Sequence, residues 1–177
     1  EQLITSGNFY IDKTGFIKEW WENGDVVTLI TRPRRFGKTL NISMTEQFFS
    51  VEYAGKEELF RDLSIWKEET YRRLQGTYPV ISLSFASIKE TSFDDARKQI
   101  CQVIKELYNK HDYLLAADCL NTDEKEQYQK ISAEMENYLA AGSLRALSNY
   151  LMRYYKKKVI ILLDEYDTPL QEAYVYG

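Results

Sequence analysis

Apolar and polar residues alternate along the chain in blocks that predict strands and helices in turn. Two β-branched runs, 26–31 and 159–163, and a third run at 79–85 that begins with proline have the composition of strands. Between these runs, apolar residues recur every three or four positions, which predicts amphipathic helices. Strands that alternate with helices are typical of an α/β sandwich with a parallel sheet and right-handed crossovers. We therefore expect an α/β fold in which the strand at 159–163 is buried on both faces.

Capping residues and glycines set the limits of the expected helices. The expected helices are, in chain order, one from Asp12 to Gly24, one from near Gly37, one from Ser92, one from Thr122 to Gly142, and one from Ser143. The third of these has its apolar stripe at Phe93, Ala96, Ile100, Val103, Ile104 and Leu107. The pattern weakens over 51–77, where we expect short helices and loops.

A candidate phosphate-binding loop joins the first expected strand to the helix near Gly37. The run 32–39 reads Arg-Pro-Arg-Arg-Phe-Gly-Lys-Thr. At a helix start the backbone N–H groups are unpaired and the helix dipole is positive, and Lys38 adds a charge, so phosphate is the expected ligand. In the usual pattern the hydroxyl after the lysine, here Thr39, ligates Mg²⁺. The match is partial, because that pattern has glycine where this chain has Arg32.

A pair of carboxylates follows the last expected strand. Ligands of parallel sheets bind beyond the carboxyl ends of the strands, where Asp164 and Glu165 stand. Asp164 is a candidate Mg²⁺ ligand, and Glu165 a candidate to orient or deprotonate an attacking water. The alternative is a carboxylate-rich strand end that starts a helix near Pro169. The loop and the carboxylates together favour a nucleotide site.

The arginines of the loop have two open interpretations. Pro33 offers no N–H, so guanidinium groups of Arg34 and Arg35 are candidates to supply bidentate phosphate contacts instead. The alternative is that they pair with the carboxylates near Asp164 when no nucleotide is bound. Both interpretations can hold in sequence, with nucleotide displacing the carboxylates.

Composition narrows the remaining classes of function. A chain of 177 residues with 44% hydrophobic residues is expected to form a single domain. Its net charge of −4 does not indicate a general nucleic-acid binder. No apolar run approaches the roughly 20 residues that span a bilayer, and we expect a cytoplasmic protein. With His111 as the sole histidine and two cysteines outside any metal-binding spacing, histidine-based nucleophilic catalysis and zinc sites are disfavoured.

Four segments together resemble the prokaryotic AAA-ATPase-like domain family. They are Tyr-Ile-Asp-Lys-Thr at 10–14, the loop with its flanks at 31–41, Tyr-Pro-Val-Ile at 78–81, and Leu-Asp-Glu-Tyr-Asp-Thr-Pro at 163–169. The resemblance extends from about Phe9 to the end, and the family's loop also lacks the first glycine. It implies a three-layer P-loop NTPase sandwich with a mostly parallel sheet, a Walker A loop, a Walker B strand and a catalytic glutamate after the Mg²⁺ aspartate. It also implies that 1–177 is the N-terminal portion of such a domain, truncated after the Walker B strand. A nuclease-like domain of the PD-(D/E)XK type often follows.

These observations predict Mg²⁺-dependent ATP binding and hydrolysis that drives or regulates an attached domain or partner. The expected catalytic residues are Lys38 and Glu165, and the expected Mg²⁺ ligands are Thr39 and Asp164. The expected nucleotide contacts are Tyr10, Asp12, Lys13, Arg34, Arg35, Phe36, Gly37, Lys38, Thr39 and Leu40, with 10–14 a candidate to contact the base. The alternative is a non-enzymatic module, either a nucleotide-dependent switch or a scaffold, and a small-molecule kinase is a third class. Oligomeric state, a nucleic-acid partner and the choice of ATP or GTP stay open.

Overall fold

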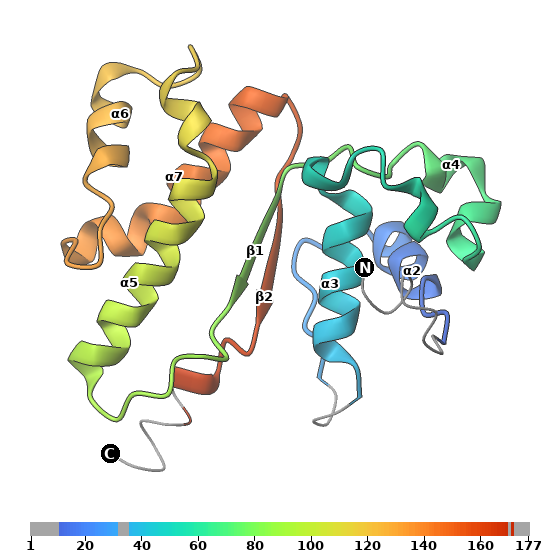
Figure 1. Cartoon of the computed structure of the whole chain (residues 1–177), viewed down its shortest axis with the longest axis horizontal. Coiled ribbons are helices and arrows are strands. Elements are labelled where there is room, and N and C mark those ends of the chain that lie inside the picture. Colours follow the sequence, from blue (N-terminus) through green and yellow to red (C-terminus); the bar gives the residue numbers. More distant parts are fainter. Residues whose placement is uncertain (1–10, 32–35, 170, 172–177) are drawn as a thin grey trace. The chain divides into compact units, whose positions relative to one another are not determined.

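The computed structural model describes residues 11–31, 36–169 and 171 (Figure 1). The chain divides into two compact units, Glu1–Val80 and Ile81–Gly177, each with its own internal packing. Among the described helices, none is long and apolar enough to cross a lipid bilayer.

The first unit is helical. Its elements are α2 (Gly15–Asn23), α3 (Lys38–Phe49), the 3₁₀ turns η1 (Val51–Tyr53), η2 (Glu57–Leu59) and η3 (Ser64–Lys67), and α4 (Glu69–Arg72). The helix near Gly37 and the short helices of 51–77 are therefore confirmed. The helix predicted from Asp12 is present but begins later, because Thr14 occupies its N-cap position and Asp12 lies outside it. The predicted glycine end is confirmed, with Gly24 in the left-handed region at φ 66°.

Aromatic side chains hold α2 against α3. The rings of Trp21 and Phe49 stack with centroids 5.2 Å apart, and Phe49 meets Phe48 edge-to-face at 5.0 Å. Ile17, on the same helix as Trp21, is fully buried. Stacked and edge-to-face pairs add to the burial of apolar area, so this cluster fixes α2 on α3.

The strand predicted at 26–31 is absent. These residues adopt no regular structure, and Val26 and Val27 are 100% and 85% exposed. Strand propensity expresses how well a side chain fits a paired, half-buried surface, and no described strand pairs with this run. One polar contact reaches it: the indole N–H of Trp20 donates to the Thr28 hydroxyl at 3.1 Å.

The second unit contains a small parallel sheet and its covering helices. Its elements are β1 (Val80–Ser84), which begins at the last residue of the first unit, α5 (Phe93–Lys110), η4 (Asp112–Leu115), α6 (Thr122–Gln129), α7 (Asn137–Tyr155) and β2 (Ile160–Asp164). The two strands lie side by side and parallel (Figure 1). The α/β class and both strands of this unit are thereby confirmed.

The core of this unit joins α5, α7 and β1. Its fully buried or nearly buried members include Ile81, Leu83, Cys101, Ile104, Leu107, Leu114, Leu147 and Leu151. The prediction that the last strand is buried on both faces is wrong, since Ile161 and Leu163 are 44% and 43% exposed. In the described chain β2 has β1 as its neighbour on one edge alone, so its side chains lack the surroundings of a central strand.

Two details of the helices differ from the sequence pattern. The helix predicted from Thr122 to Gly142 stops at Gln129, and α7 runs through Gly142 and Ser143 without interruption. Ser143 is buried inside α7 instead of capping it: its hydroxyl donates to Ala140 O at 2.7 Å, and its carbonyl accepts from Tyr108 of α5 at 2.8 Å. A serine there lets α7 approach α5.

The predicted cap at Ser92 is confirmed, because its hydroxyl accepts from the Asp95 N–H at 3.1 Å. The first residue assigned to the apolar stripe of this helix, Phe93, is 79% exposed, so that part of the prediction is wrong. Phe93 is the first helical residue, and the stripe that enters the core begins farther along α5.

Leu147→Ala is expected to destabilise the chain strongly. Leu147 lies on α7 and is fully buried. Truncation of such a leucine leaves a cavity that lowers the free energy of unfolding by about 2–5 kcal/mol. Urea unfolding followed by circular dichroism measures the loss. Met152→Ala, at a side chain of the same helix that is 44% exposed, is the control and should cost far less. Equal losses in the two variants would contradict the packing of α7 described above.

Candidate functional site

The amino end of α3 has the features of an anion-binding helix start. Gly37 precedes the helix in the left-handed region at φ 77°, and the first intrahelical hydrogen bond runs from Asn41 N–H to Gly37 O at 2.9 Å. The N–H groups of Lys38, Thr39 and Leu40 therefore come before the hydrogen-bonded part of the helix. This first turn contains no acidic residue, and its N-cap residue, Gly37, has no side chain that could cap it. The positive end of the helix dipole is thus not neutralised locally.

A lysine from another segment lies at the same point. A Cβ placed on Gly37 would be 3.2 Å from Lys13 Nζ. The Lys13 ammonium is therefore next to Gly37, although 24 positions separate the two residues in the sequence (37 − 13). The structure brings together Lys13 and Gly37, two of the residues predicted to bind nucleotide.

The carboxylate of Asp12 is held by hydrogen bonds from Thr14 and Ser64. Its Oδ1 accepts from the Thr14 N–H at 2.9 Å and from the Thr14 hydroxyl at 2.6 Å, and its Oδ2 accepts from the Ser64 N–H at 2.7 Å. Burial alone would raise the pKa of this carboxyl. The hydrogen bonds from Ser64 and Thr14 together outweigh burial and lower the pKa to about 2. Asp12 is therefore ionised at neutral pH and tied to two other residues.

The lowered pKa of Asp12 predicts a loss of stability in acid. A carboxyl whose folded-state pKa lies below its ordinary 3.8 stabilises the fold fully above that pH, and the contribution disappears as pH falls toward about 2. Thermal melting of the unaltered chain and of Asp12→Asn, measured from neutral pH down to about pH 2, checks this. The difference in melting temperature between them should be constant near neutrality and shrink below about pH 4. A difference that does not change with pH would contradict the ionised state of Asp12.

Three further residues belong to this region: Ser64 and Asn41 were not predicted as site residues, and Thr14 was included only in the run 10–14. Thr14 is fully buried, and Ser64 supplies hydrogen bonds from a distant part of the chain. Asn41, 3% exposed on the first turn of α3, has an amide oxygen without a hydrogen-bond partner among the described residues. Thr14 stands in the sequence motif at 10–14, but no local pattern marks Ser64, since its role depends on a contact across the fold.

The remaining loop residues are distributed unevenly. Phe36 is 58% exposed, Thr39 is exposed, and Lys38 and Leu40 are partly buried. Tyr10, Arg34 and Arg35 lie outside the described residues.

The two predicted carboxylates follow β2 in the second unit. Asp164 is 8% exposed, and no hydrogen bond or ion pair reaches its side chain from the residues that the structure describes. Its carbonyl accepts from Phe85 N–H at 3.1 Å, which ties the end of β2 to the end of β1. A buried carboxylate needs a cation or hydrogen-bond donors, so Asp164 fits the predicted role of a metal ligand.

Glu165 has an unusual backbone. Its φ is +50°, a left-handed conformation that costs a non-glycine residue about 1 kcal/mol or more. Its carbonyl accepts from Thr168 N–H at 3.1 Å, and residues 168, 169 and 171 are helical, as predicted for the region near Pro169. Strain of this kind is common where a side chain is held in a functional orientation. The loop residues belong to one unit and this pair to the other, so their convergence stays a prediction.

Comparison with known proteins gives a family and one distant relative. A family model described as "Predicted AAA-ATPase" matches residues 1–176. The chain is 28% identical over 162 residues to an "Uncharacterized protein in vnfD 5'region" of Azotobacter chroococcum mcd 1, an alignment that covers 92% of this chain. The chain spans about a quarter of that relative, 26% of its length. No solved structure gives a significant match.

Proposed function

We propose that this chain, which belongs to the predicted AAA-ATPase family, binds ATP with Mg²⁺ and hydrolyses it to drive or regulate an attached domain or partner. The observation that carries the proposal is the amino end of α3. There, unpaired N–H groups and the positive end of the helix dipole coincide with Lys38, the first helical residue, and the first turn contains no acidic residue. Polyphosphate is the ligand whose charge fits this combination.

Different residues of the loop would make different contacts with the nucleotide. The N–H groups of Lys38 and Thr39 hold the phosphates, and the Lys38 ammonium contacts the terminal ones. Arg34 and Arg35 are proposed to add guanidinium contacts in place of the missing glycine loop, with Phe36 and Leu40 beside them.

Mg²⁺ fits the oxygen donors that the chain offers. Among the described residues, no group of three or more His, Cys, Asp or Glu side chains could hold a metal alone. The ion would therefore bind together with the phosphates, held by the Thr39 hydroxyl and by the buried carboxylate of Asp164. When bound, it would neutralise phosphate charge. Glu165, next in the chain, would orient the attacking water and accept its proton.

The proposal extends to the fold and to the whole protein. We propose that 1–177 belongs to one P-loop domain of the three-layer class. A further domain, nuclease-like by the family resemblance, is proposed as the element that the ATP cycle regulates. We also propose a cytoplasmic setting, where ATP is available.

A second candidate function is a switch that binds nucleotide without hydrolysing it. The absence of a strand at 26–31 favours this candidate, because the run that precedes the loop is then not held in a sheet. The loop's departure from the glycine-rich pattern points the same way.

Two measurements on the unaltered chain separate these functions. Calorimetric titration with ATP and Mg²⁺ is expected to give saturable binding, and a phosphate-release assay is expected to detect turnover that requires Mg²⁺. Binding without release would favour the switch. Absence of binding in the titration would refute both and leave a scaffold.

A further inference from the structure

We propose that Lys13 is a second phosphate-binding lysine, and that Asp12 is the positioning residue that holds it beside the start of α3. The inference rests on the proposed function and deepens it, because it assigns a phosphate contact within the same nucleotide site. It also changes the role expected for Lys13, from contact with the base to contact with the phosphates.

The place of the Lys13 ammonium is the first argument. It lies 3.2 Å from the position of a Cβ on Gly37, the residue that precedes the first turn of α3. The same turn carries Lys38 and no acidic side chain. Two ammonium groups at the positive end of a helix repel each other and the helix dipole, so the arrangement favours an anion of more than one charge. A diphosphate or triphosphate has the charge to engage both lysines.

The contacts of Asp12 are the second argument. Both of its carboxylate oxygens already accept hydrogen bonds, from Thr14 and from Ser64. An ionised carboxylate beside phosphate would also be repelled by it. Asp12 is thus suited to anchor the segment that carries Lys13, and unsuited to bind the nucleotide itself.

Thr14 connects Asp12 to the segment at 64–65 through its hydroxyl. Its hydroxyl has one proton, which it donates to Asp12 Oδ1 at 2.6 Å. Its oxygen is then free to accept, from the Ser64 hydroxyl at 3.0 Å and from the Ile65 N–H at 3.2 Å. Asp12 and Thr14 flank Lys13 and are bound to the same short segment, so the backbone of Lys13 is fixed from both sides.

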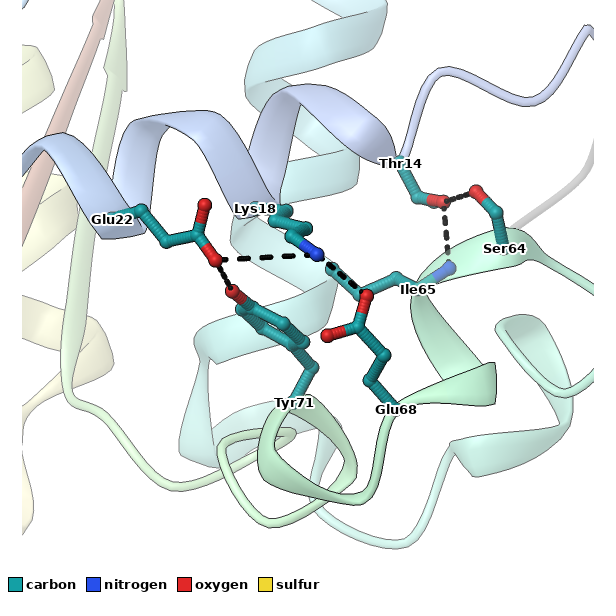
Figure 2. Close-up of polar contacts among 7 residues, drawn as sticks. All are labelled: Thr14, Lys18, Glu22, Ser64, Ile65, Glu68 and Tyr71. Atoms are coloured by element: carbon teal, nitrogen blue, oxygen red, sulfur yellow. Dashed lines mark hydrogen bonds and ion pairs between the residues drawn. The ribbon is translucent and has the colours of Figure 1, made fainter.

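Polar contacts along α2 extend this attachment (Figure 2). Side chains spaced four residues apart, on the N-cap and on one side of the helix, reach the segment that carries η3 and α4. The pairs are Thr14 with Ser64 at 3.0 Å, Lys18 with Glu68 at 2.7 Å, and Glu22 with Tyr71 at 2.7 Å. On another side, α2 packs on α3 through the stacked rings of Trp21 and Phe49. The position of Lys13 relative to Gly37 is therefore determined by packing as well as by hydrogen bonds.

Substitution of Lys13 tests the first part of the proposal. Lys13→Gln is expected to weaken the binding of ATP with Mg²⁺ by about tenfold, the size expected for one charge-assisted contact. Binding of inorganic tripolyphosphate, a probe without a base, should weaken by a similar factor. Lys13→Arg keeps the charge and should restore most of the affinity. Lys98→Gln is the matched control: it removes a lysine of α5 that pairs with Glu134 at the surface and has no part in the attachment of α2, and affinity should stay within about twofold.

A double-variant cycle tests the second part. Asp12→Asn alone is expected to lower ATP affinity by up to about tenfold, but to lower it by less than about twofold when Lys13→Gln is already present. The loss of thermal stability caused by Asp12→Asn should be the same with and without Lys13→Gln, because the hydrogen bonds among Asp12, Thr14 and Ser64 do not depend on Lys13. If Asp12→Asn does not fold, Ser64→Ala can replace it, because it removes the hydroxyl that contacts Thr14. Its effect on ATP affinity should likewise shrink when Lys13→Gln is already present.

Each contrary result overturns a different statement. If Lys13→Gln binds ATP normally while Lys38→Ala does not, Lys13 is not a phosphate ligand and the proposed function stands. If Lys13→Gln weakens ATP but not tripolyphosphate, Lys13 contacts the nucleoside instead. If the effects of Asp12→Asn and Lys13→Gln add, Asp12 does not act through Lys13. If the unaltered chain binds no ATP, the proposed function fails as well.

Discussion

Lys38→Ala is expected to abolish ATP binding, with a loss of affinity of at least about a hundredfold. Lys38 is the first residue of α3, and charge-assisted hydrogen bonds from such a lysine to phosphate contribute about 1.5–3 kcal/mol each. Alanine favours the helix, so the variant should retain its fold. Calorimetric titration with ATP and Mg²⁺ measures the affinity, and circular dichroism verifies the fold.

Lys158→Ala is the control for net charge. Lys158 is an exposed lysine near β2, and its removal changes the charge of the chain by the same amount. Its affinity for ATP should equal that of the unaltered chain. If both variants lost the same modest fraction of affinity, binding would reflect general electrostatic attraction, and the start of α3 would have no special role.

Glu165→Gln is expected to separate binding from turnover. The amide cannot accept a proton from water, and loss of a general base usually costs about 10²–10⁴-fold in rate. ATP affinity should stay within about twofold, since the assigned role begins only when water attacks. Glutamine tolerates the left-handed backbone at φ +50° about as well as glutamate, so the fold should persist. Phosphate release at saturating ATP and Mg²⁺ measures the rate.

Asp167→Asn provides the comparison for Glu165→Gln. Asp167 lies two residues on and accepts a hydrogen bond from Gln171 at 2.6 Å, so it is a nearby carboxylate with a structural partner. Its loss should leave the rate of phosphate release largely unchanged. Undiminished turnover in Glu165→Gln would remove Glu165 from the mechanism, and equal losses in the two variants would indicate an effect of charge alone.

Local patterns predicted those elements whose signals are also local. Ser92 and Gly24 mark helix ends because a side-chain oxygen or a left-handed glycine satisfies groups within one turn. The helix near Gly37 follows from periodicity, and the last strand, predicted at 159–163 and observed at Ile160–Asp164, follows from a run of branched side chains. These features need no knowledge of the rest of the fold.

Features that depend on distant partners were mispredicted or missed. The valines of 26–31 have strand composition, but a strand exists only when another strand pairs with it. Gly142 and Ser143 have the composition of a helix boundary, yet they lie inside α7, where the Ser143 carbonyl accepts a hydrogen bond from Tyr108. Sequence resemblance marked Asp12 and Lys13 as site residues but did not distinguish their roles. The anchoring role of Asp12 follows from its hydrogen bond with Ser64, which lies 52 positions away in the sequence.

The hydrogen bond between Trp20 and Thr28 makes the fluorescence of Trp20 a reporter on the run 26–31. Indole fluorescence shifts in wavelength and intensity when the ring's polar environment changes, and this ring is bonded to the exposed run that leads into the phosphate loop. The chain has three tryptophans, and Trp21 is already stacked on Phe49 in the core of the first unit. Any ordering of 26–31 would therefore register first in the emission of Trp20, with no dye attached.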